Sequence, residues 1–225
     1  MDKKVFRIAL SGVLVAMAFV LSYIKLPGLP YGGSVTLFSM VPIVFIGCTF
    51  GPVWGLFMSL VYSLLQLLQS AGGSSFAGQG AGGVILIILF DFVLAFGVLG
   101  LGGMFVTKKN ISKKYAPALA AGGAAIVTLI RYICHIISGF VLYGQYAEWF
   151  FEDEWVNSMS QWILANVKGN KLALVYSAVY NGLYMIPEII LTTVGTFIIM
   201  TVLLNVRSTK YRLIDERNTP IFSKS

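Results

Sequence analysis

The chain has 225 residues, of which 57% are hydrophobic and only 11% are charged. A soluble globular domain carries about 25% charged residues, so this composition argues against a soluble protein and indicates an integral membrane protein. The formal net charge of +7 could indicate a nucleic-acid partner, but the positions of the basic residues explain it through membrane topology instead.

Long apolar runs recur along the chain and predict an all-α integral membrane protein, a bundle of six transmembrane helices in a single domain, residues 1–225. The first run is too long for a cleavable signal peptide and no small-residue cleavage site follows it. The connection at 144–171 is expected to be an acidic outer loop that carries tryptophans. The expected spans are about residues 5–24, 36–50, 53–69, 84–106, 116–143 and 172–205.

Six spans place both termini on the same face of the membrane. Twelve of the sixteen basic residues gather on that face, in the N-terminal segment, the connection between the fourth and fifth spans, and the C-terminal tail. The opposite face carries only Lys25, Lys168 and Lys171, beside four acidic residues. The positive-inside rule therefore predicts cytoplasmic N- and C-termini.

The fifth span contains an unusual polar stripe. His135 is the only histidine of the chain, Arg131 lies four residues before it, and Ser138 and Gly139 follow at three and four residues. Residues at this spacing share one face of a helix. An ionisable residue at membrane depth costs roughly 2.5–3.5 kcal/mol on insertion scales, so this stripe is a candidate functional site.

Polar residues of two other spans reach the same depth. With a rise of about 1.5 Å per residue, His135 lies roughly 12 Å below the outer end of its span and Asp91 roughly 10 Å. By the same measure Tyr176 and Asn181 lie roughly 6 and 14 Å deep. This coincidence predicts a small-molecule site in the outer half of the bundle, with a proton or ion pathway as the alternative.

Arg131 and Glu188 lie deeper, near the midplane. They are expected to form a structural ion pair between the fifth and sixth spans, and a pair of Arg131 with Asp91 is the alternative. His135 taken alone could equally be a packing residue of the bundle.

A carboxylate among aromatic rings suits a flat organic cation, because ring faces attract cations by about 0.5–2 kcal/mol. A carboxylate also accepts hydrogen bonds from an aminopyrimidine edge. The aromatic residues expected near this site, any of which could instead be belt or packing residues, are Tyr31, Tyr62, Phe92, Tyr143, Tyr146 and Tyr184.

The sequence carries no Walker A, HExxH or GxSxG pattern, so no enzymatic activity, metal or cofactor is expected. Cys48 and Cys134 lie in apolar runs without ligand spacing and are interpreted as small apolar residues. Two other classes stay open beside a binding subunit. One is an intramembrane enzyme that uses Asp91 and His135, which would turn over a substrate, and the other is a scaffold, which would bind no small molecule.

Five sequence blocks together resemble the thiamin-specific substrate-binding component (S-component) of energy-coupling-factor (ECF) vitamin transporters. The resemblance covers roughly residues 5–205. The blocks are GGSVTLFSMVPI (Gly32–Ile43), LVYSLLQ (Leu60–Gln66), FDFVLAFGVLGLGG (Phe90–Gly103), RYICHIISGFVLYGQY (Arg131–Tyr146) and YSAVYNGLYMIPE (Tyr176–Glu188).

The resemblance implies a six-helix bundle in the bacterial plasma membrane that binds one thiamin near its outer face. Such a component docks on a transmembrane coupling subunit that carries two cytoplasmic ATPases, so ATP is used by the partners and thiamin is the transported ligand. An S-component for another small vitamin or a thiamin precursor is the alternative.

The resemblance also implies roles for single residues. Asp91 stands where the family has an acid, usually glutamate, that faces either the pyrimidine or the thiazolium ring of the ligand. Phe92 stands where a tyrosine is common. His135 matches a histidine that hydrogen-bonds the ligand, and Gly139 matches a glycine that the ligand approaches. Tyr143 stands where a tryptophan stacks in some members.

Three further residues complete the expected ligand site. Tyr176 and Asn181 match the tyrosine and asparagine of the last helix, and Tyr62 takes the place of a wall aromatic. A lid tryptophan of some members is missing, which leaves Tyr31 as a substitute.

The first span offers a face of small residues, Ala9, Gly12 and Ala16, at steps of three and four. Such a face lets another helix approach closely. The resemblance implies that the coupling subunit docks here, and packing within the bundle is the alternative.

Overall fold

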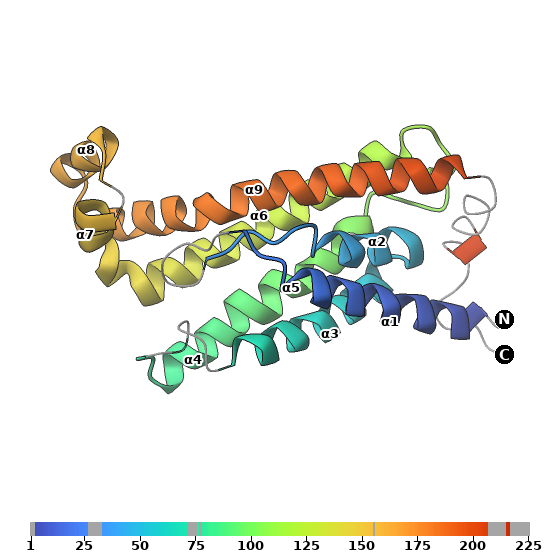
Figure 1. Cartoon of the computed structure of the whole chain (residues 1–225), viewed down its shortest axis with the longest axis horizontal. Helices are drawn as coiled ribbons and strands as arrows, with labels where there is room; N and C mark the ends of the chain where they lie inside the picture. The colour runs from blue at the N-terminus through green and yellow to red at the C-terminus, as the bar shows by residue number, and fades with distance from the viewer. Residues whose placement is uncertain are drawn as a thin grey trace.

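Two long helices form one side of the molecule in the computed structural model, which describes residues 3–26, 33–71, 76, 78–154, 156–206 and 215–216. They are α6 (Ala116–Tyr143) and α9 (Asn170–Asn205), and they run side by side (Figure 1). At a rise of 1.5 Å per residue α9 is about 54 Å long. A bilayer's hydrocarbon core is about 30 Å thick, so part of α9 extends beyond it.

Helices α1 (Lys3–Leu21) and α3 (Pro52–Ser70) lie on the other side of the bundle (Figure 1). A composite helix completes it, built from α4 (Ala81–Ile87), the π-helical η3 (Ile88–Leu94), α5 (Ala95–Gly97) and the 3₁₀-helical η4 (Val98–Gly103). Within the described residues, five helices are long and apolar enough to cross a membrane. They are Lys3–Leu21, Pro52–Ser70, Ala81–Gly103, Ala116–Glu154 and Asn170–Asn205.

The second expected span, residues 36–50, differs from the prediction. It contains only the ten-residue helix α2 (Val41–Phe50), and every residue of α2 is buried. Phe38 has a positive φ of 58°, and Pro42 stands in the first turn of α2, where its missing N–H costs nothing. The segment is therefore apolar because it lies inside the bundle, and it is too short to cross a bilayer by itself.

Glycines bring the short helices into backbone contact. A Cβ on Gly100 of η4 would overlap the backbone of Gly55 in α3, and one on Gly103 would overlap the backbone of Gly47 in α2. Small residues of this kind let membrane helices approach closely. They hold α2, α3 and η4 together and so position α3, and η3 in the same composite helix as η4, around the site described below.

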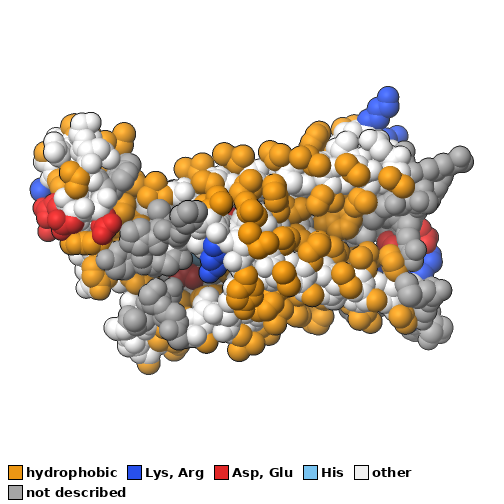
Figure 2. All heavy atoms as spheres, in the orientation of Figure 1, with side chains coloured by type: hydrophobic (Ala, Val, Ile, Leu, Met, Phe, Trp, Pro, Cys, Tyr) orange, Lys and Arg blue, Asp and Glu red, His pale blue; other side chains and the backbone are white. Residues whose placement is uncertain are grey.

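Residues near the two chain ends lie at the same end of the bundle (Figure 1). Lys3 forms an ion pair of 2.7 Å with Asp215. Arg7 is buried beside Glu216, and its guanidinium lies 5.5 Å from the centroid of the Phe50 ring. The apolar exterior of the bundle separates this end from the acidic side chains near α7 and α8 (Figure 2).

The connection at 144–171, expected to be a loop, is largely helical. Phe150 and Phe151 are buried here and form a small second core with Tyr176, while the neighbouring acids stay exposed. Asn157 and Ser160 form a capping box that starts the last of its helices. The helices are η5 (Gly144–Tyr146), α7 (Ala147–Trp149), the π-helical η6 (Phe150–Glu154) and α8 (Ser158–Asn166).

Candidate functional site

A cavity of about 510 Å³ opens at the end of the bundle that carries α7 and α8. Its walls come from α3, η3, α6, α9 and the connection between α1 and α2. All eight residues expected to bind a ligand line it: Tyr62, Asp91, Phe92, His135, Gly139, Tyr143, Tyr176 and Asn181. Tyr31, the expected substitute for a lid residue, lies outside the described residues.

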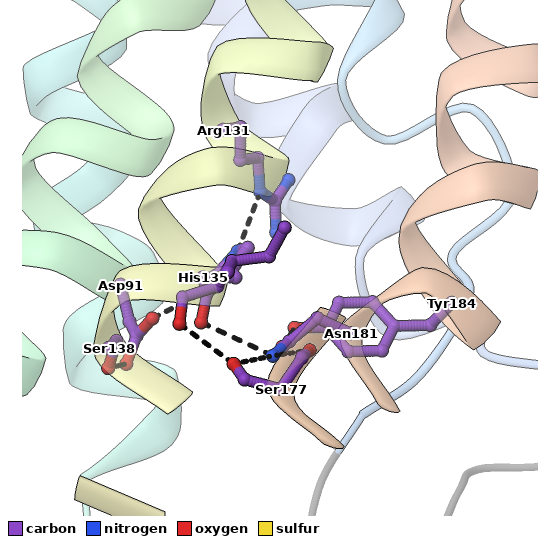
Figure 3. A network of polar contacts seen from close by, with 8 residues as sticks. Asp91, Arg131, His135, Ser138, Ser177, Asn181 and Tyr184 are labelled. Carbon is purple, nitrogen blue, oxygen red and sulfur yellow. Dashed lines mark hydrogen bonds and ion pairs between the residues drawn. The ribbon is translucent and has the colours of Figure 1, made fainter. Parts of the chain in front are cut away.

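Asp91 lies at one edge of the polar network in the cavity, beside His135 and Ser138 (Figure 3). Its Oδ1 lies 2.7 Å from Nδ1 of His135, and its Oδ2 accepts a hydrogen bond of 2.6 Å from the Ser138 hydroxyl. Asp91 stands on the π-helical segment η3, an interruption that often occurs where a helix carries a functional residue. The predicted stripe of α6 thus faces the acid of the fourth span.

Arg131 determines which nitrogen of His135 carries the proton. The Nε of Arg131 donates to Nε2 of His135 at 3.2 Å, so Nε2 is an acceptor. The proton of the neutral ring is therefore on Nδ1, which donates to Asp91. Asp91 remains the negative group of the network, held by two donors.

The guanidinium of Arg131 contacts an aromatic ring and a thioether sulfur. It lies 4.1 Å from the centroid of the Phe96 ring, and its Nη1 contacts Sδ of Met40 at 2.7 Å. Cation–π contact of this kind stabilises a desolvated guanidinium.

The expected ion pair of Arg131 with Glu188 is not formed in the described part of the chain, and neither is a direct pair of Arg131 with Asp91. Oε1 of Glu188 instead accepts 2.6 Å hydrogen bonds from the backbone N and the hydroxyl of Thr36. Glu188 therefore ties α9 to the segment that precedes α2, and His135 stands between Arg131 and Asp91.

Asn181 joins α9 to α6. Its Nδ2 donates to the carbonyl oxygens of His135, at 3.2 Å, and of Ser177, at 2.8 Å. Its Oδ1 accepts a 2.5 Å hydrogen bond from the Tyr184 hydroxyl. A Cβ on Gly139 would lie 2.9 Å from Nδ2 of Asn181 and closer still to the Ser177 hydroxyl. The missing side chain of Gly139 thus permits the close approach of α6 and α9, and the residue also lines the cavity.

Three tyrosines of α9 form one wall of the cavity. The ring centroids of Tyr176 and Tyr180 are 5.9 Å apart, and those of Tyr180 and Tyr184 are 6.4 Å apart. Phe150 of the outer helices packs edge-on against Tyr176 at 5.2 Å. The sequence interpretation missed Tyr180, although a spacing of four residues between the three tyrosines was a usable signal.

The opposite wall consists of phenylalanines and one buried tyrosine. Phe92 stacks on Phe76 at a centroid distance of 6.0 Å and on Phe96 at 6.2 Å. Tyr62 is fully buried and meets Phe96 edge-on at 5.4 Å. Tyr143 lines the cavity from the last residue of α6.

The arrangement suits the binding of a flat organic cation. A carboxylate held by two donors faces a cavity between two aromatic walls, and hydroxyl and amide groups surround it. Among the described residues there is no cluster of His, Cys, Asp and Glu that could hold a metal ion. Cys48 and Cys134 are buried free thiols, which fits their interpretation as small apolar residues.

Two relatives resemble the chain over most of its length. The thiamine transporter ThiT of Bacillus subtilis (strain 168) is 28% identical over 200 residues, which are 86% of this chain and 89% of that protein. The thiamine transporter ThiT of Lacticaseibacillus paracasei is 26% identical over 211 residues, which are 91% of this chain and 89% of that protein.

A solved structure of ThiT from Listeria monocytogenes has the same fold, with a TM-score of 0.62. The match covers 95% of this chain and 99% of that chain at 23% sequence identity. The family described as "Thiamine transporter protein (Thia_YuaJ)" matches residues 8–160. This match extends over more than half of the chain, and the protein therefore belongs to the thiamine transporter protein family, a family of membrane transport proteins and not of enzymes.

Proposed function

We propose that the chain binds thiamin in this cavity and acts as the substrate-binding subunit of an ECF-type importer in the bacterial plasma membrane. The observation that carries the proposal is the Asp91 carboxylate, which faces a 510 Å³ cavity between aromatic walls. The names of the relatives and of the family support thiamin as the ligand.

The chemistry of thiamin fits this cavity. Its thiazolium ring carries a fixed positive charge, which a carboxylate and aromatic faces attract. Its aminopyrimidine ring is flat and bears hydrogen-bonding groups. Ligand cavities of small molecules usually measure about 300–1,000 Å³ and combine apolar walls with a few placed polar groups, which describes this one.

The small-residue face of α1 supports a partner subunit. Ala9, Gly12 and Ala16 are exposed, and a Cβ on Gly12 would meet no atom within 4 Å. The buried side of α1 is the opposite one, which carries Ser11 and Leu14. The exposed face therefore favours docking of a coupling subunit, whose two ATPases would supply the energy, over packing within the bundle.

Charge at the two ends supports an orientation with cytoplasmic termini. The lysines of the connection between η4 and α6 are exposed, as are the acids of η6 at the other end. The positive-inside rule places the lysine-bearing end in the cytoplasm and the cavity in the outer half of the membrane.

Titration of the detergent-purified protein with thiamin tests the proposal. Trp149 lines the cavity, so binding should quench tryptophan fluorescence with saturation at sub-micromolar thiamin, and neither riboflavin nor biotin should do so. Trp149→Phe should remove most of the quenching while calorimetry still reports binding. Absence of a calorimetric signal with thiamin on the wild-type protein would refute the assignment.

Assembly is tested separately on α1. Gly12→Trp should prevent co-purification of the coupling subunit and its ATPases while thiamin binding is retained, because the bulky ring blocks a close helix contact. Ile190→Trp, at an exposed position of α9, is the matched control and should leave assembly intact. Loss of thiamin binding in Gly12→Trp would show that the face is internal.

A further inference from the structure

Apolar side chains lie on both sides of α8. Ile163 faces inward and belongs to the small second core with Phe150. On the outside, Val156, Met159 and Trp162 are 58%, 59% and 63% exposed. Met159 and Trp162 are three residues apart, so they share one face of the helix. A single exposed apolar side chain is ordinary, but three together mark a contact surface, called here the outer face of α8.

The place of α8 in the fold shows where this face can make contact. In Figure 1, α8 lies near the start of α9, on the side away from α3 and α4. None of the nine described residues of α8 lines the cavity. The helix therefore projects from the flank of the bundle and does not cover the opening of the cavity.

The apolar exterior of the bundle continues up to this flank. Leu174 of α9 is 49% exposed and stands four residues after the start of the helix, which is about 6 Å along the axis. Val141 is 57% exposed and lies two residues before the end of α6. Lipid covers exposed apolar side chains of spanning helices, so the surface of the membrane lies close to α8 and its outer face continues the lipid-facing exterior.

The residue types around α8 match the boundary between lipid and water. Tryptophan is enriched at this boundary, where its ring sits at the level of the headgroups. Lys168 and Lys171 are exposed between α8 and the first turn of α9, where an ammonium group can reach a lipid phosphate. Acidic side chains gather at the outermost edge of this region (Figure 2), and Glu152 and Asp153 are exposed there. The acids thus point to water, while the apolar and basic groups remain for the lipid.

We propose that the outer face of α8 is a membrane-surface anchor that inserts between phospholipid headgroups at the cavity end of the bundle, with Lys168 and Lys171 bound to lipid phosphates. The anchor ties one wall of the cavity to the membrane surface, because Phe150 of the same connection packs against Tyr176. This inference does not depend on thiamin as the ligand, and its test contains no thiamin.

Quenching by brominated lipids tests the anchor. Trp54→Phe, Trp149→Phe and Trp155→Phe together leave Trp162 as the only tryptophan. The protein is reconstituted into phosphatidylcholine and phosphatidylglycerol vesicles with bromine either near the headgroup or near the chain ends. Trp162 should lose more fluorescence to the shallow bromines than to the deep ones, and aqueous iodide should quench it little.

A protein that keeps only Trp149 is the matched control. This residue lines the cavity, so neither brominated lipid should quench it strongly. For Trp162, strong quenching by iodide alone would show a face in water and would overturn the anchor. Quenching by neither agent would mean that another protein covers the face, and stronger quenching by the deep bromines would place it in the hydrocarbon core, so each of these results is also incompatible with the proposal.

Hydrogen exchange in lipid nanodiscs provides a second test that keeps the other tryptophans. Met159→Gln combined with Trp162→Gln removes the apolar groups and retains residues that favour a helix. The amides of α8 should then exchange about 3- to 10-fold faster, because the helix loses its lipid contact, while α9 stays protected. Gln161→Ala, at an exposed position on another flank of α8, should leave exchange unchanged. Equal exchange in the double variant and wild type would contradict the anchor.

Discussion

Asp91→Asn separates the charge of the site from its hydrogen bonds. With its amide oxygen toward His135 and its amide nitrogen toward Ser138, asparagine keeps the contact with the Nδ1–H of the histidine. The Ser138 hydroxyl can rotate and accept from the new amide, since hydroxyl groups both donate and accept. The variant should therefore fold normally and differ from wild type chiefly by one negative charge.

The size of the effect follows from Coulomb's law. A cation about 4 Å from a carboxylate gains about 4 kcal/mol at an effective dielectric constant of 20. The Asp91 side chain is 21% exposed, and desolvation of both charges offsets part of this gain. A loss of about 2–3 kcal/mol remains, which corresponds to an increase in the thiamin Kd of about 30- to 150-fold.

Isothermal calorimetry with two ligands measures the effect. The first ligand is thiamin, and the second is an analogue whose thiazolium is replaced by an uncharged thiophene. Asp91→Asn should weaken thiamin strongly and the thiophene analogue little, because only thiamin carries the charge. If the variant binds thiamin within about threefold of wild type, the carboxylate does not pair with the cationic ring and the reasoning fails.

His135→Ala should raise the thiamin Kd by about tenfold, because Asp91 loses one donor that orients it, and the fold should be retained; unfolding seen by circular dichroism would make His135 a structural residue. Gly139→Ala should destabilise the protein by about 1–3 kcal/mol through overlap with Ser177, and an unchanged unfolding temperature would contradict the close helix contact. Asn157→Ala should cost about 1 kcal/mol at the start of α8 and speed proteolysis there, while equal cleavage rates would show that the cap is dispensable.

Apolar length predicted the long helices well and failed at α2. The run at 36–50 has the composition of a span, but a helix buried on all sides is equally apolar. Val41–Phe50 is such a helix, enclosed by the bundle over its whole length. Hydropathy cannot separate the two cases, because both lipid and a protein interior exclude water.

The helices of the 144–171 connection were not predicted, because charged residues interrupt its apolar sequence. Glu152, Asp153 and Glu154 follow directly on Phe150 and Phe151, so no long apolar run marks the segment. Burial of the two phenylalanines against α9 gives it structure, and this packing is a tertiary effect that local composition does not carry.

Depth along a helix predicted which residues share the cavity, but not which atoms pair. Arg131 and Glu188 lie in one layer and carry opposite charges, and yet Glu188 bonds to Thr36, a residue of a non-helical segment whose course the sequence does not reveal. The spacing of four residues did place Arg131 beside His135, because that contact lies within a single helix.

The polar stripe of α6 shows how a costly set of residues in a membrane protein can serve binding. Arg131 donates to Nε2 of His135 and so directs the proton of the neutral ring toward Asp91. Asp91 accepts hydrogen bonds from this Nδ1–H and from the hydroxyl of Ser138, and both of these donor groups are neutral. The carboxylate is therefore oriented without being neutralised, which leaves its charge available to a cationic ligand. An Arg131–Asp91 ion pair would have stabilised the bundle but cancelled that attraction, and the histidine between them prevents it.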